Sequence, residues 1–462
     1  MVSILNKDKK AFSKSTYFII LNHNSTKYCL FSCNKISFVS LQPAMENTNI
    51  IGKAKLIETK AFDYDLPDHR IARYPLNRRE DSKLLVLKED KIIESKFYNI
   101  GEFLPEKAMM VFNNTKVVRA RLLFRKAEGA VIELFTLEPA SDTVDLQLAF
   151  AKHSPVNWKC LVGNSKRWKS GILEMNLNHP EGSIRLCAER LQKESDYSVI
   201  SFSWDKSGVS FAEILELAGE MPLPPYLNRK AENSDLERYQ TVFAMYDGSV
   251  AAPTAGLHMT EDLVKNLKLK DVQFEQLTLH VGAGTFKPLS TLTIGNHSIH
   301  AEKISISRVT IVNLMQQTGN PIIAIGTTSL RTLESLYWIA SIIQKNIDIQ
   351  DIKVEQWMPY QQQSNDIGDS KTAFQQILNY IDHHQADHLQ ATTSIMIVPG
   401  YKFKIVNGLV TNFHQPMSTL LLLVSALIGE KWKKVYQYAL DNEFRFLSYG
   451  DSCLFMQYKE NQ

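Results

Sequence analysis

The fold is decided by the stretch PIIAIGTTSLRTLESLYWIASII, which covers residues 321–343. Its first part, Pro321–Ile325, is short, apolar and rich in β-branched residues, as is typical of a buried strand. Gly326 and three hydroxyl residues follow at once. Apolar side chains then recur at helical spacing from Leu330 to Ile343. The stretch therefore predicts a strand, a tight turn and a helix.

Similar units lie on both sides of this stretch. Apolar residues at Phe211, Ile214, Leu215 and Ala218 predict an amphipathic helix that ends near Gly219. Ser418 is placed to cap a helix over Leu420–Ile428. Strands are predicted at Leu84–Leu87, Met109–Phe112, Leu277–Val281 and Ile395–Val398. This alternation predicts an α/β (mixed α+β) domain.

Residues 117–206 have a different sequence pattern. Short alternating runs separated by turn residues occur here, namely Val144/Leu146/Leu148/Phe150, Trp158/Cys160/Val162 and Ile200/Phe202/Trp204. Such spacing predicts a small antiparallel β-barrel. We therefore expect a barrel insert at 117–206 within a large α/β catalytic domain formed by 45–116 and 207–462. The Gln- and His-rich residues 361–392 are expected to form a surface excursion.

The first 44 residues stand apart. They contain six lysines and one acid, Asp8, and so contribute +5 to a total formal charge of +3. The rest of the chain is close to neutral, which excludes a globally basic nucleic-acid binder and leaves only a local patch. We expect 1–44 to be a disordered extension and Met45 to be the natural start, and whether the extension is translated stays open.

The cysteines favour a reducing compartment. The five of them are scattered along the chain without any C-x-x-C pair, which argues against a zinc or thioredoxin-like site and for a cytoplasmic protein. The longest apolar run, Leu420–Val424 extended to Ile428, is too short to span a bilayer.

Two glycine-containing motifs suggest ligand contacts. Gly282 and Gly284 directly follow a strand and precede Thr285, where glycine permits close approach of the backbone to a ligand. The dinucleotide fingerprint is excluded because its third glycine position is Lys287. In the second motif, Thr327, Thr328 and Ser329 begin a helix, where they serve as caps, as ligand contacts, or as both.

Histidines gather around the first glycine motif. His280, His297 and His300, with Glu302, are candidates for a general base or proton shuttle. A metal site ranks lowest because no H-E-x-x-H spacing occurs. If 299–302 is a strand, His300 and Glu302 share one face. Further polar clusters contain His258, Asn412, His414 and Asp451. His258 is equally well explained as a satisfied core imidazole.

Arginines form two groups. Arg119, Arg121 and Arg125 are spaced by even numbers of positions, so in a strand they lie on one face and make that face basic. A second cluster contains Arg73 and Arg78. Arginine binds phosphate oxygens bidentately, which suggests a nucleic-acid surface. A solvated strand face is the simpler alternative.

The motifs taken in order resemble one family, the S-adenosylmethionine:tRNA ribosyltransferase-isomerases of queuosine biosynthesis. The resemblance covers about residues 60–458. It is carried by FDYDLP at 62–67, IARYP at 71–75, FNNT at 112–115, MPLPPY at 221–226, AAPTAGLH at 251–258, TLHVGAGTF at 278–286, GTTS at 326–329, TNFH at 411–414 and YGD at 449–451. The sequence departs from the family's usual pattern at four positions. Ile299 and Ala301 replace the Met and Ser of the usual H-x-M-H-S-E, and Gln415 replaces the Leu of F-H-L-P. Asn407 stands where an acidic residue is usual.

The resemblance implies a two-domain protein and a reaction. S-adenosylmethionine donates its ribosyl group to 7-aminomethyl-7-deazaguanine at the tRNA wobble position, adenine and methionine leave, and epoxyqueuosine-tRNA forms. The partners implied are tRNA and S-adenosylmethionine, with no metal, no cofactor, no membrane and a monomeric enzyme. His280, His297, His300 and Glu302 would supply acid and base. The substrate contacts and the tRNA-binding arginines would be those named above. Alternatives are an inactive tRNA-binding paralogue and an enzyme acting on another nucleoside substrate.

Overall fold

The computed structural model describes residues 50–141, 146–282, 289–361 and 367–457, together with the backbone of β1 (Ile19–Ile20), β2 (Cys29–Ser32) and β3 (Lys35–Phe38). Apart from those strands, the predicted extension over 1–44 and the start at Met45 lie outside the described residues. Within these ranges no helix is long and apolar enough to cross a membrane.

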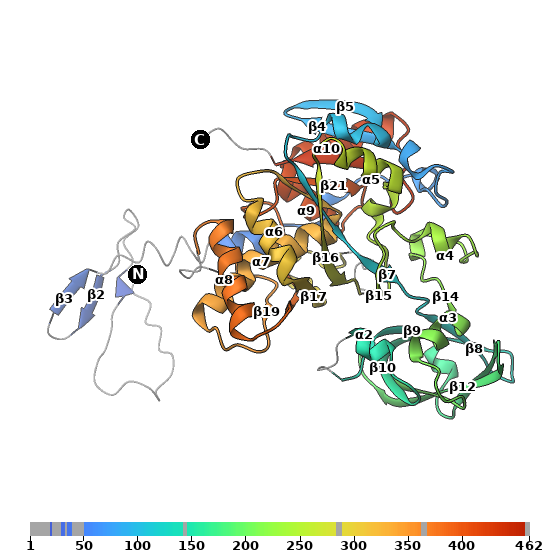
Figure 1. Ribbon diagram of the computed structural model, residues 1–462. Helices are drawn as coiled ribbons and strands as arrows, with labels where there is room; N and C mark the ends of the chain where they lie inside the picture. The colour runs from blue at the N-terminus through green and yellow to red at the C-terminus, as the bar shows by residue number, and fades with distance from the viewer. Residues whose placement is uncertain are drawn as a thin grey trace.

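A ten-stranded mixed sheet forms the large domain (Figure 1). Its spatial order is β19 (Lys353–Val354), β20 (His388–Thr393), β17 (Glu302–Ser307), β16 (Gln273–His280), β6 (Met109–Asn113), β18 (Ile322–Ile325), β21 (Gly408–Asn412), β22 (Ser452–Met456), β4 (Lys83–Lys88) and β5 (Lys91–Lys96). The strand and helix predicted over 321–343 are both present, as β18 and the helix after it. The predicted α/β class is confirmed.

The centre of the sheet is parallel. Strand β6 pairs in parallel with β16 on one side and with β18 on the other, and β18 continues in parallel to β21. Across the sheet the order of these strands is β16, β6, β18 and β21. The connection after β6 leads to β16 on one side, whereas the connection after β18 leads to β21 on the other side. The strand order thus reverses between β6 and β18, and open α/β sheets bind ligands at such a topological switch point.

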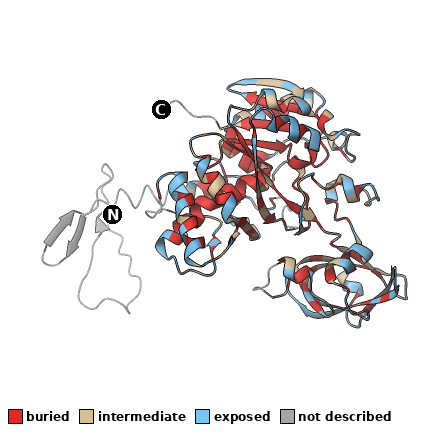
Figure 2. Ribbon diagram, viewed as in Figure 1, coloured by how far each residue is buried: buried red, intermediate tan, exposed pale blue. Residues whose placement is uncertain are grey.

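Helices cover the two faces of the sheet unequally. The larger core lies under α6 (Arg308–Gln316), α7 (Thr327–Lys345), α8 (Ser370–His383), α9 (Thr419–Ile428) and α10 (Lys431–Asp441). The other face carries α5 (Glu261–Lys268). Strand β6 contributes side chains to both cores. Met109 and Val111 pack in the larger core, and Met110 packs in the core under α5. Figure 2 shows this layer of buried residues through the large domain.

Helix α7 is anchored by polar groups as well as by apolar packing. Glu334 is completely buried, and its carboxylate accepts hydrogen bonds from Tyr401 Oη at 2.8 Å and from the backbone N–H groups of residues 404–406 at 2.8–3.0 Å. Burial raises the pKa of this carboxyl group. The next residue of the helix also bonds to the sheet, because Ser335 Oγ lies 2.7 Å from Thr393 Oγ1 at the end of β20. These bonds fix the position of α7 against the sheet.

The insert is a curled antiparallel sheet with its own core. Its strand order is β11 (Leu173–His179), β12 (Gly182–Lys193), β13 (Ser198–Trp204), β10 (Val156–Gly163), β9 (Val131–Pro139), β8 (Arg121–Arg125) and β14 (Gly219–Glu220). Strand β11 at one end approaches β8, the next-to-last strand at the other end, so the sheet nearly closes. Phe211 fills the interior, with its ring centroid 4.9 Å from Trp158 and 5.4 Å from Phe202. The predicted barrel is present.

The insert reaches further along the chain than predicted. Phe211 begins helix α3 (Phe211–Ala218), whose apolar face packs inside the insert, and β14 pairs with β8. The boundary expected at residue 206 therefore falls before two elements that belong to the insert. Strand β7 (Thr115–Val117), paired in parallel with β15 (Tyr246–Ser249), leads from the large domain into it.

Three local predictions differ from the structure. The strand predicted over 144–150 is not present in the described residues 146–150. These residues form the helix α2 (Leu146–Phe150), which buries Leu146, Ala149 and Phe150 at helical spacing. Residues 361–392 are more than a surface excursion, because α8 buries Phe374, Ile377 and Ile381 in the main core.

The third difference is Ile395–Val398, which is buried but is not a strand. Side chains supply the hydrogen bonds that a ladder would otherwise provide. Val398 N–H donates to Tyr360 Oη at 3.0 Å, and Tyr360 Oη donates to Met396 O at 3.1 Å. Buried backbone groups require partners but do not require that those partners be another strand. The remaining short elements are α4 (Asp235–Arg238) and 3-10 helices that include η4 (Phe97–Glu102), η6 (Pro225–Leu227), η7 (Thr254–His258), η9 (Ile294–Asn296) and η10 (Met358–Tyr360).

We predict that Glu334→Gln lowers the free energy of unfolding by about 3 kcal/mol, because the new amide N–H group faces backbone donors in a buried site. Urea unfolding followed by circular dichroism measures the change. The exposed Glu430→Gln should shift stability by less than about 0.5 kcal/mol. Equal stability of the two variants would show that the Glu334 bonds do not hold α7.

Candidate active site

A pocket lies at the switch point, where β18 and β21 end. We call it the switch-point pocket. Its lining includes Gly326, Thr327 and Thr328 at the start of α7, Asn412 and His414 after β21, and the segment Ala251–Ala255. Its volume is about 80 Å³. Three separate parts of the chain thus meet where the topology favours a ligand.

The first turn of α7 lacks a side-chain cap. Gly326 occupies the N-cap position with φ of 91°, a conformation that favours glycine, and no side chain accepts from the turn. The predicted capping by threonine or serine is therefore wrong for the described helix. Ser329 points away from the pocket, because its Oγ donates to Ile325 O at 2.8 Å. The uncapped N–H groups and the helix dipole favour electron-rich ligand atoms in this pocket.

A buried histidine positions Asn412. His258 Nε2 accepts from the Asn412 amide at 3.0 Å, and His258 Nδ1 lies 2.9 Å from Ser82 Oγ. Burial, with Arg445 nearby, lowers the pKa of His258 to about 3, so the imidazole is neutral at physiological pH. Because Nε2 accepts, Nδ1 carries the proton and donates to Ser82. His258 is thus a satisfied core imidazole that orients a pocket residue.

Asn412 keeps one acceptor for a ligand. It is 2% exposed, and its Oδ1 has no hydrogen-bond partner among the described residues. An unpaired buried amide oxygen costs free energy unless a ligand donor completes it. The arrangement therefore suits a ligand with an N–H or O–H group.

His414 and Asp451 brace this region. His414 Nε2 lies 2.9 Å from Thr411 Oγ1, and burial lowers the His414 pKa to about 3. Asp451 is buried behind the pocket, where it accepts from the backbone N–H groups of Lys83 at 2.9 Å and Arg445 at 2.7 Å. The structure places His414 on the pocket wall, but it places Asp451 where it joins β4 to the loop before β22.

A second pocket, which we call the histidine pocket, adjoins the first. Its lining includes Gly282, His297, His300, Glu302 and Arg331, with apolar residues Ile395–Ile397, Leu420 and Leu423. Leu420 also lines the switch-point pocket, so the two are neighbours. The structure thus brings together three of the four predicted catalytic residues.

An ion pair at the base of the histidine pocket was not predicted from the sequence. Arg331 Nη1 donates to Glu302 Oε2 at 2.5 Å, and both side chains are almost completely buried. Arg331 Nη2 has no hydrogen-bond partner among the described residues. A sequence signal existed, because Arg331 and Glu334 are the two charged residues within the otherwise uncharged stretch 327–344. Gln356 holds the histidine segment, since its amide accepts from Ile299 N–H and donates to His297 O.

His280 lies apart from the other catalytic candidates. In the β16–β17 ladder it stands opposite Lys303, so those two side chains share a face of the sheet. Glu302, the neighbour of Lys303, points to the other face. His280 accordingly lines a third pocket. The expected His300 strand is also absent, because β17 begins only at Glu302. Gly284 and Thr285 lie outside the described residues.

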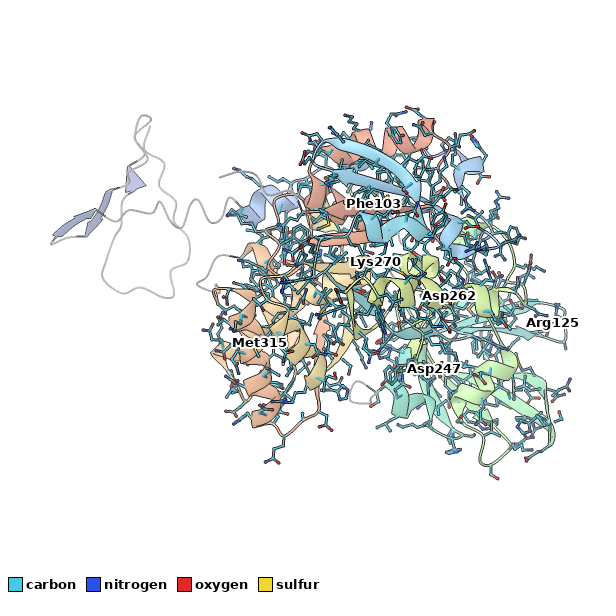
Figure 3. The ribbon with its side chains drawn as sticks, turned by 45° about the horizontal axis from the view of Figure 1, so that its top comes forward. Phe103, Arg125, Asp247, Asp262, Lys270 and Met315 are labelled. Carbon is cyan, nitrogen blue, oxygen red and sulfur yellow. The ribbon has the colours of Figure 1, made fainter. Side chains whose placement is uncertain are left out.

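The predicted tRNA-binding arginines differ in their surroundings. Arg121 is paired with Glu133 at 2.9 Å, and the Arg119 side chain donates to Glu216 O. Arg73 pairs with Asp68 at 2.6 Å and Arg78 with Glu80 at 2.5 Å, both near the surface. The Arg125 side chain has no ionic partner among the described residues. Figure 3 shows Arg125 at the outer end of the insert.

Comparison with known proteins gives a consistent result. A family model described as "Queuosine biosynthesis protein" matches residues 59–455. A protein of Trichlorobacter lovleyi named S-adenosylmethionine:tRNA ribosyltransferase-isomerase is 36% identical, over 86% of this chain and 98% of the relative. A protein of the same name from Rickettsia bellii is 37% identical, over 85% and 97% respectively. The crystal structure of S-adenosylmethionine tRNA ribosyltransferase from Thermotoga maritima is 27% identical, covers 85% of this chain and 99% of that one, and has a TM-score of 0.40.

The neutral state of His258 predicts a pH dependence. In the unfolded chain an imidazole titrates near 6.5, and in the folded protein His258 titrates near 3. Between these values the unfolded state binds the extra proton. His258 therefore lowers the free energy of unfolding as pH falls from about 6.5 toward 3, by up to about 1.4 kcal/mol per pH unit.

His258→Gln should flatten this dependence, as measured by urea unfolding at a series of pH values from 4.5 to 7.5. His69→Gln is the matched control and should leave the slope unchanged, because His69 is exposed and has no side-chain hydrogen bond or ion pair among the described residues. An equal slope in wild type and His258→Gln would contradict the assignment.

Proposed function

The chain belongs to the queuosine biosynthesis protein family, and from this premise we propose that it is an S-adenosylmethionine:tRNA ribosyltransferase-isomerase. It transfers the ribosyl group of S-adenosylmethionine to 7-aminomethyl-7-deazaguanine at the tRNA wobble position and rearranges that ribose. Adenine and methionine leave, and epoxyqueuosine-tRNA remains. S-adenosylmethionine is a substrate here, and the mechanism invokes no cofactor or metal. A cytoplasmic location follows from the tRNA substrate.

The adjoining pockets at the switch point support this proposal most directly. S-adenosylmethionine has a flat adenosyl group at one side of its sulfonium and an amino acid at the other, and two pockets meet at Leu420. The switch-point pocket supplies the Asn412 acceptor and the uncapped N–H groups of α7, which match the exocyclic amine and ring nitrogens of adenine.

The histidine pocket suits the methionyl group. Ile395–Ile397 and Leu423 provide an apolar wall for a thioether chain. Arg331 Nη2 has no hydrogen-bond partner among the described residues and can donate to the α-carboxylate. Glu302 beside it can bind the α-ammonium group. In this arrangement Glu302 is a positioning residue, because its carboxylate is already engaged by Arg331.

The reaction requires a base and an acid between the pockets. The sulfonium charge acidifies the proton on the neighbouring ribose carbon, and a base must remove that proton. Adenine must gain a proton as its bond to the ribose breaks. His297 and His300 line the histidine pocket, and histidine is the side chain that most often serves as a general acid or base. We assign the base role to His300, which is the more exposed of the two.

We expect purified protein, S-adenosylmethionine and tRNA carrying 7-aminomethyl-7-deazaguanine to yield adenine and methionine in equal amounts. Chromatography measures the released adenine, and mass spectrometry of the tRNA nucleosides identifies the product. Binding of tRNA without adenine release would support an inactive paralogue. Release only with a free nucleoside or another RNA would support a shifted substrate.

His300→Ala should lower turnover by about a hundredfold to ten-thousandfold, as the loss of a general base does. The protein should stay folded and retain its affinity for S-adenosylmethionine, as calorimetry would show. His383→Ala, on the exposed face of α8, is the control and should turn over normally. Near-normal turnover of His300→Ala would transfer the base role to another residue.

The basic residues of the insert are proposed to contact tRNA phosphates. Arg125→Ala should reduce the slope of log affinity against log salt by about one unit, since one phosphate contact is lost. Fluorescence anisotropy with labelled tRNA measures both quantities. Lys434→Ala on α10 is the control and should leave both unchanged. An unaltered slope in Arg125→Ala would show that this residue is only solvated.

A further inference from the structure

Strand β16 presents a polar face that the proposed active site does not use. Along Gln273–His280 the buried residues are Glu275, Leu277 and Leu279, and the half-buried ones alternate with them. Side chains two residues apart share a face. One face of β16 thus presents Phe274, Gln276, Thr278 and His280, about 7 Å apart in succession.

Neighbouring strands extend this face mainly with uncharged groups, and Lys303 of β17, opposite His280, adds one positive charge to it. Thr278 is opposite Ser305 on β17, and Ser305 is in turn opposite Gln390 on β20. Gln390 Nε2 donates to Ser305 Oγ at 3.4 Å. On the other side of β16, Gln276 is paired with Phe112 on β6. Directly opposite side chains lie on the same face, so these two rows of residues continue across the sheet.

The insert closes one end of this face to form the third pocket, which we call the amide pocket. Its volume is about 240 Å³, and its lining includes Asn114, Gln147, Gln276, His280 and Gln390. Gln147 comes from α2 of the insert. None of the described residues that line it is an aspartate, glutamate, lysine or arginine. Such a wall offers hydrogen-bond donors and acceptors without a fixed charge.

Gly248 makes this junction possible. Its φ is 139°, and a Cβ there would lie 2.5 Å from His280 Nδ1 and 2.5 Å from Leu146 on α2. At Gly248, strand β15 therefore contacts both β16 of the sheet and α2 of the insert, and the contact leaves no space for a side chain. The amide pocket has one wall on each domain.

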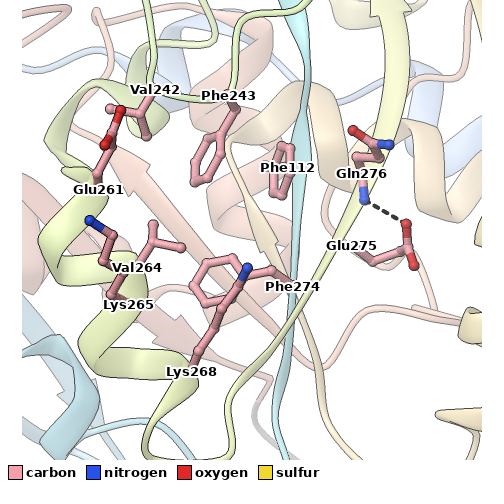
Figure 4. A pocket seen from close by; sticks show the side chains of 10 residues that line it. All are labelled: Phe112, Val242, Phe243, Glu261, Val264, Lys265, Lys268, Phe274, Glu275 and Gln276. Atoms are coloured by element: carbon pink, nitrogen blue, oxygen red, sulfur yellow. Dashed lines mark hydrogen bonds between the residues drawn. The ribbon is translucent and has the colours of Figure 1, made fainter.

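An aromatic pocket adjoins the amide pocket at Gln276, which lines both. Its volume is about 390 Å³. Figure 4 shows Phe112, Phe243 and Phe274 around it, with Lys265 and Lys268 on α5 at the rim. The rings of Phe112 and Phe243 stack with centroids 3.9 Å apart and planes inclined by 15°. Lys268 Nζ lies 5.9 Å from the Phe274 ring centroid.

The acidic residues nearby do not oppose an anionic partner strongly. Glu275 is buried, and its carboxylate accepts from Thr310 at 3.1 Å and from Asn313 at 2.6 Å. Figure 4 shows it on the opposite side of β16 from the phenylalanines. Glu261, on the exposed side of α5, lines the aromatic pocket together with Glu275 and the two lysines, so its described lining carries two acidic and two basic residues.

We propose that the aromatic and amide pockets bind two unstacked nucleobases of the tRNA next to the nucleoside that is modified. This rests on the proposed function. One base would stack on Phe243 in the aromatic pocket, and a second would be recognised by the amide side chains. Proteins recognise RNA sequence in this way, by stacking splayed bases on aromatic rings and bonding their edges to side chains.

The course of β16 supports this assignment. The strand begins at the aromatic pocket, continues along the amide pocket, and ends at Val281 and Gly282. Val281 lines the switch-point pocket and Gly282 the histidine pocket. A nucleotide chain that follows β16 is therefore led directly to the bound S-adenosylmethionine. The neutral lining contributes specificity for bases, while lysines at the rim attract the backbone.

The test uses the full chain and two RNA probes, a synthetic anticodon stem–loop and the same stem closed by a non-nucleotide linker. Phe243→Ala should weaken binding of the stem–loop between about fivefold and 150-fold, the usual effect of losing one stacked base. Phe243→Tyr should restore it. Gln390→Leu, on an exposed strand position, should also weaken binding and should leave the salt slope unchanged. Gln375→Leu on α8 is the control and should bind as wild type does.

Calorimetry with S-adenosylmethionine and thermal melting accompany each variant. Should Phe243→Ala melt early, the exposed Gln390→Leu variant decides the matter. Wild-type affinity for the stem–loop in both variants would overturn the inference, and so would an equal loss of affinity for the loopless stem. The proposed function fails separately, if the wild-type protein releases no adenine with tRNA.

Discussion

A buried carboxylate holds the element on which the candidate site is built. Glu334 lies in the middle of α7 and accepts four hydrogen bonds from the segment 401–406. The same helix presents its uncapped first turn to the switch-point pocket and Arg331 to the histidine pocket. A shift of α7 along its axis would move Glu334, the uncapped first turn and Arg331 together. Because Glu334 is desolvated, its hydrogen bonds tolerate little displacement, and both pockets keep one geometry.

The sheet divides the polar chemistry between its two faces. On the face of α7 lie Glu302, Arg331 and the two adjoining pockets. On the other lie His280 and the neutral side chains of β16, β17 and β20. Adjacent residues of one strand, such as Glu302 and Lys303, point in opposite directions. One strand can therefore present Glu302 to the small-molecule site and Lys303 to the proposed RNA surface without interference between them.

The sequence permits prediction of the parts that depend on local pattern. The strand at Pro321–Ile325, its glycine turn and the following helix have the apolar spacing of a βα unit, and they occur where that spacing predicts. Ile395–Val398 has the composition of a strand, yet side chains distant in sequence satisfy its backbone. His280 and Glu302 are close in sequence but lie on opposite faces, and only the register of β16 against β17 decides that. The Glu302–Arg331 pair joins residues on separate elements, which no local pattern reveals.

The position of the insert has a consequence during synthesis of the chain. Strand β6 emerges first, but its two partners are β16 and β18, and the last of these begins at Ile322. At 5–20 residues per second, roughly 10 to 40 s pass between completion of β6 and completion of β18. The insert is built from neighbouring strands and so can form during this interval. Until β16 and β18 are synthesised, Met109–Asn113 lacks the strands that flank it in the sheet, and a chaperone that binds exposed apolar segments can bind it during this interval.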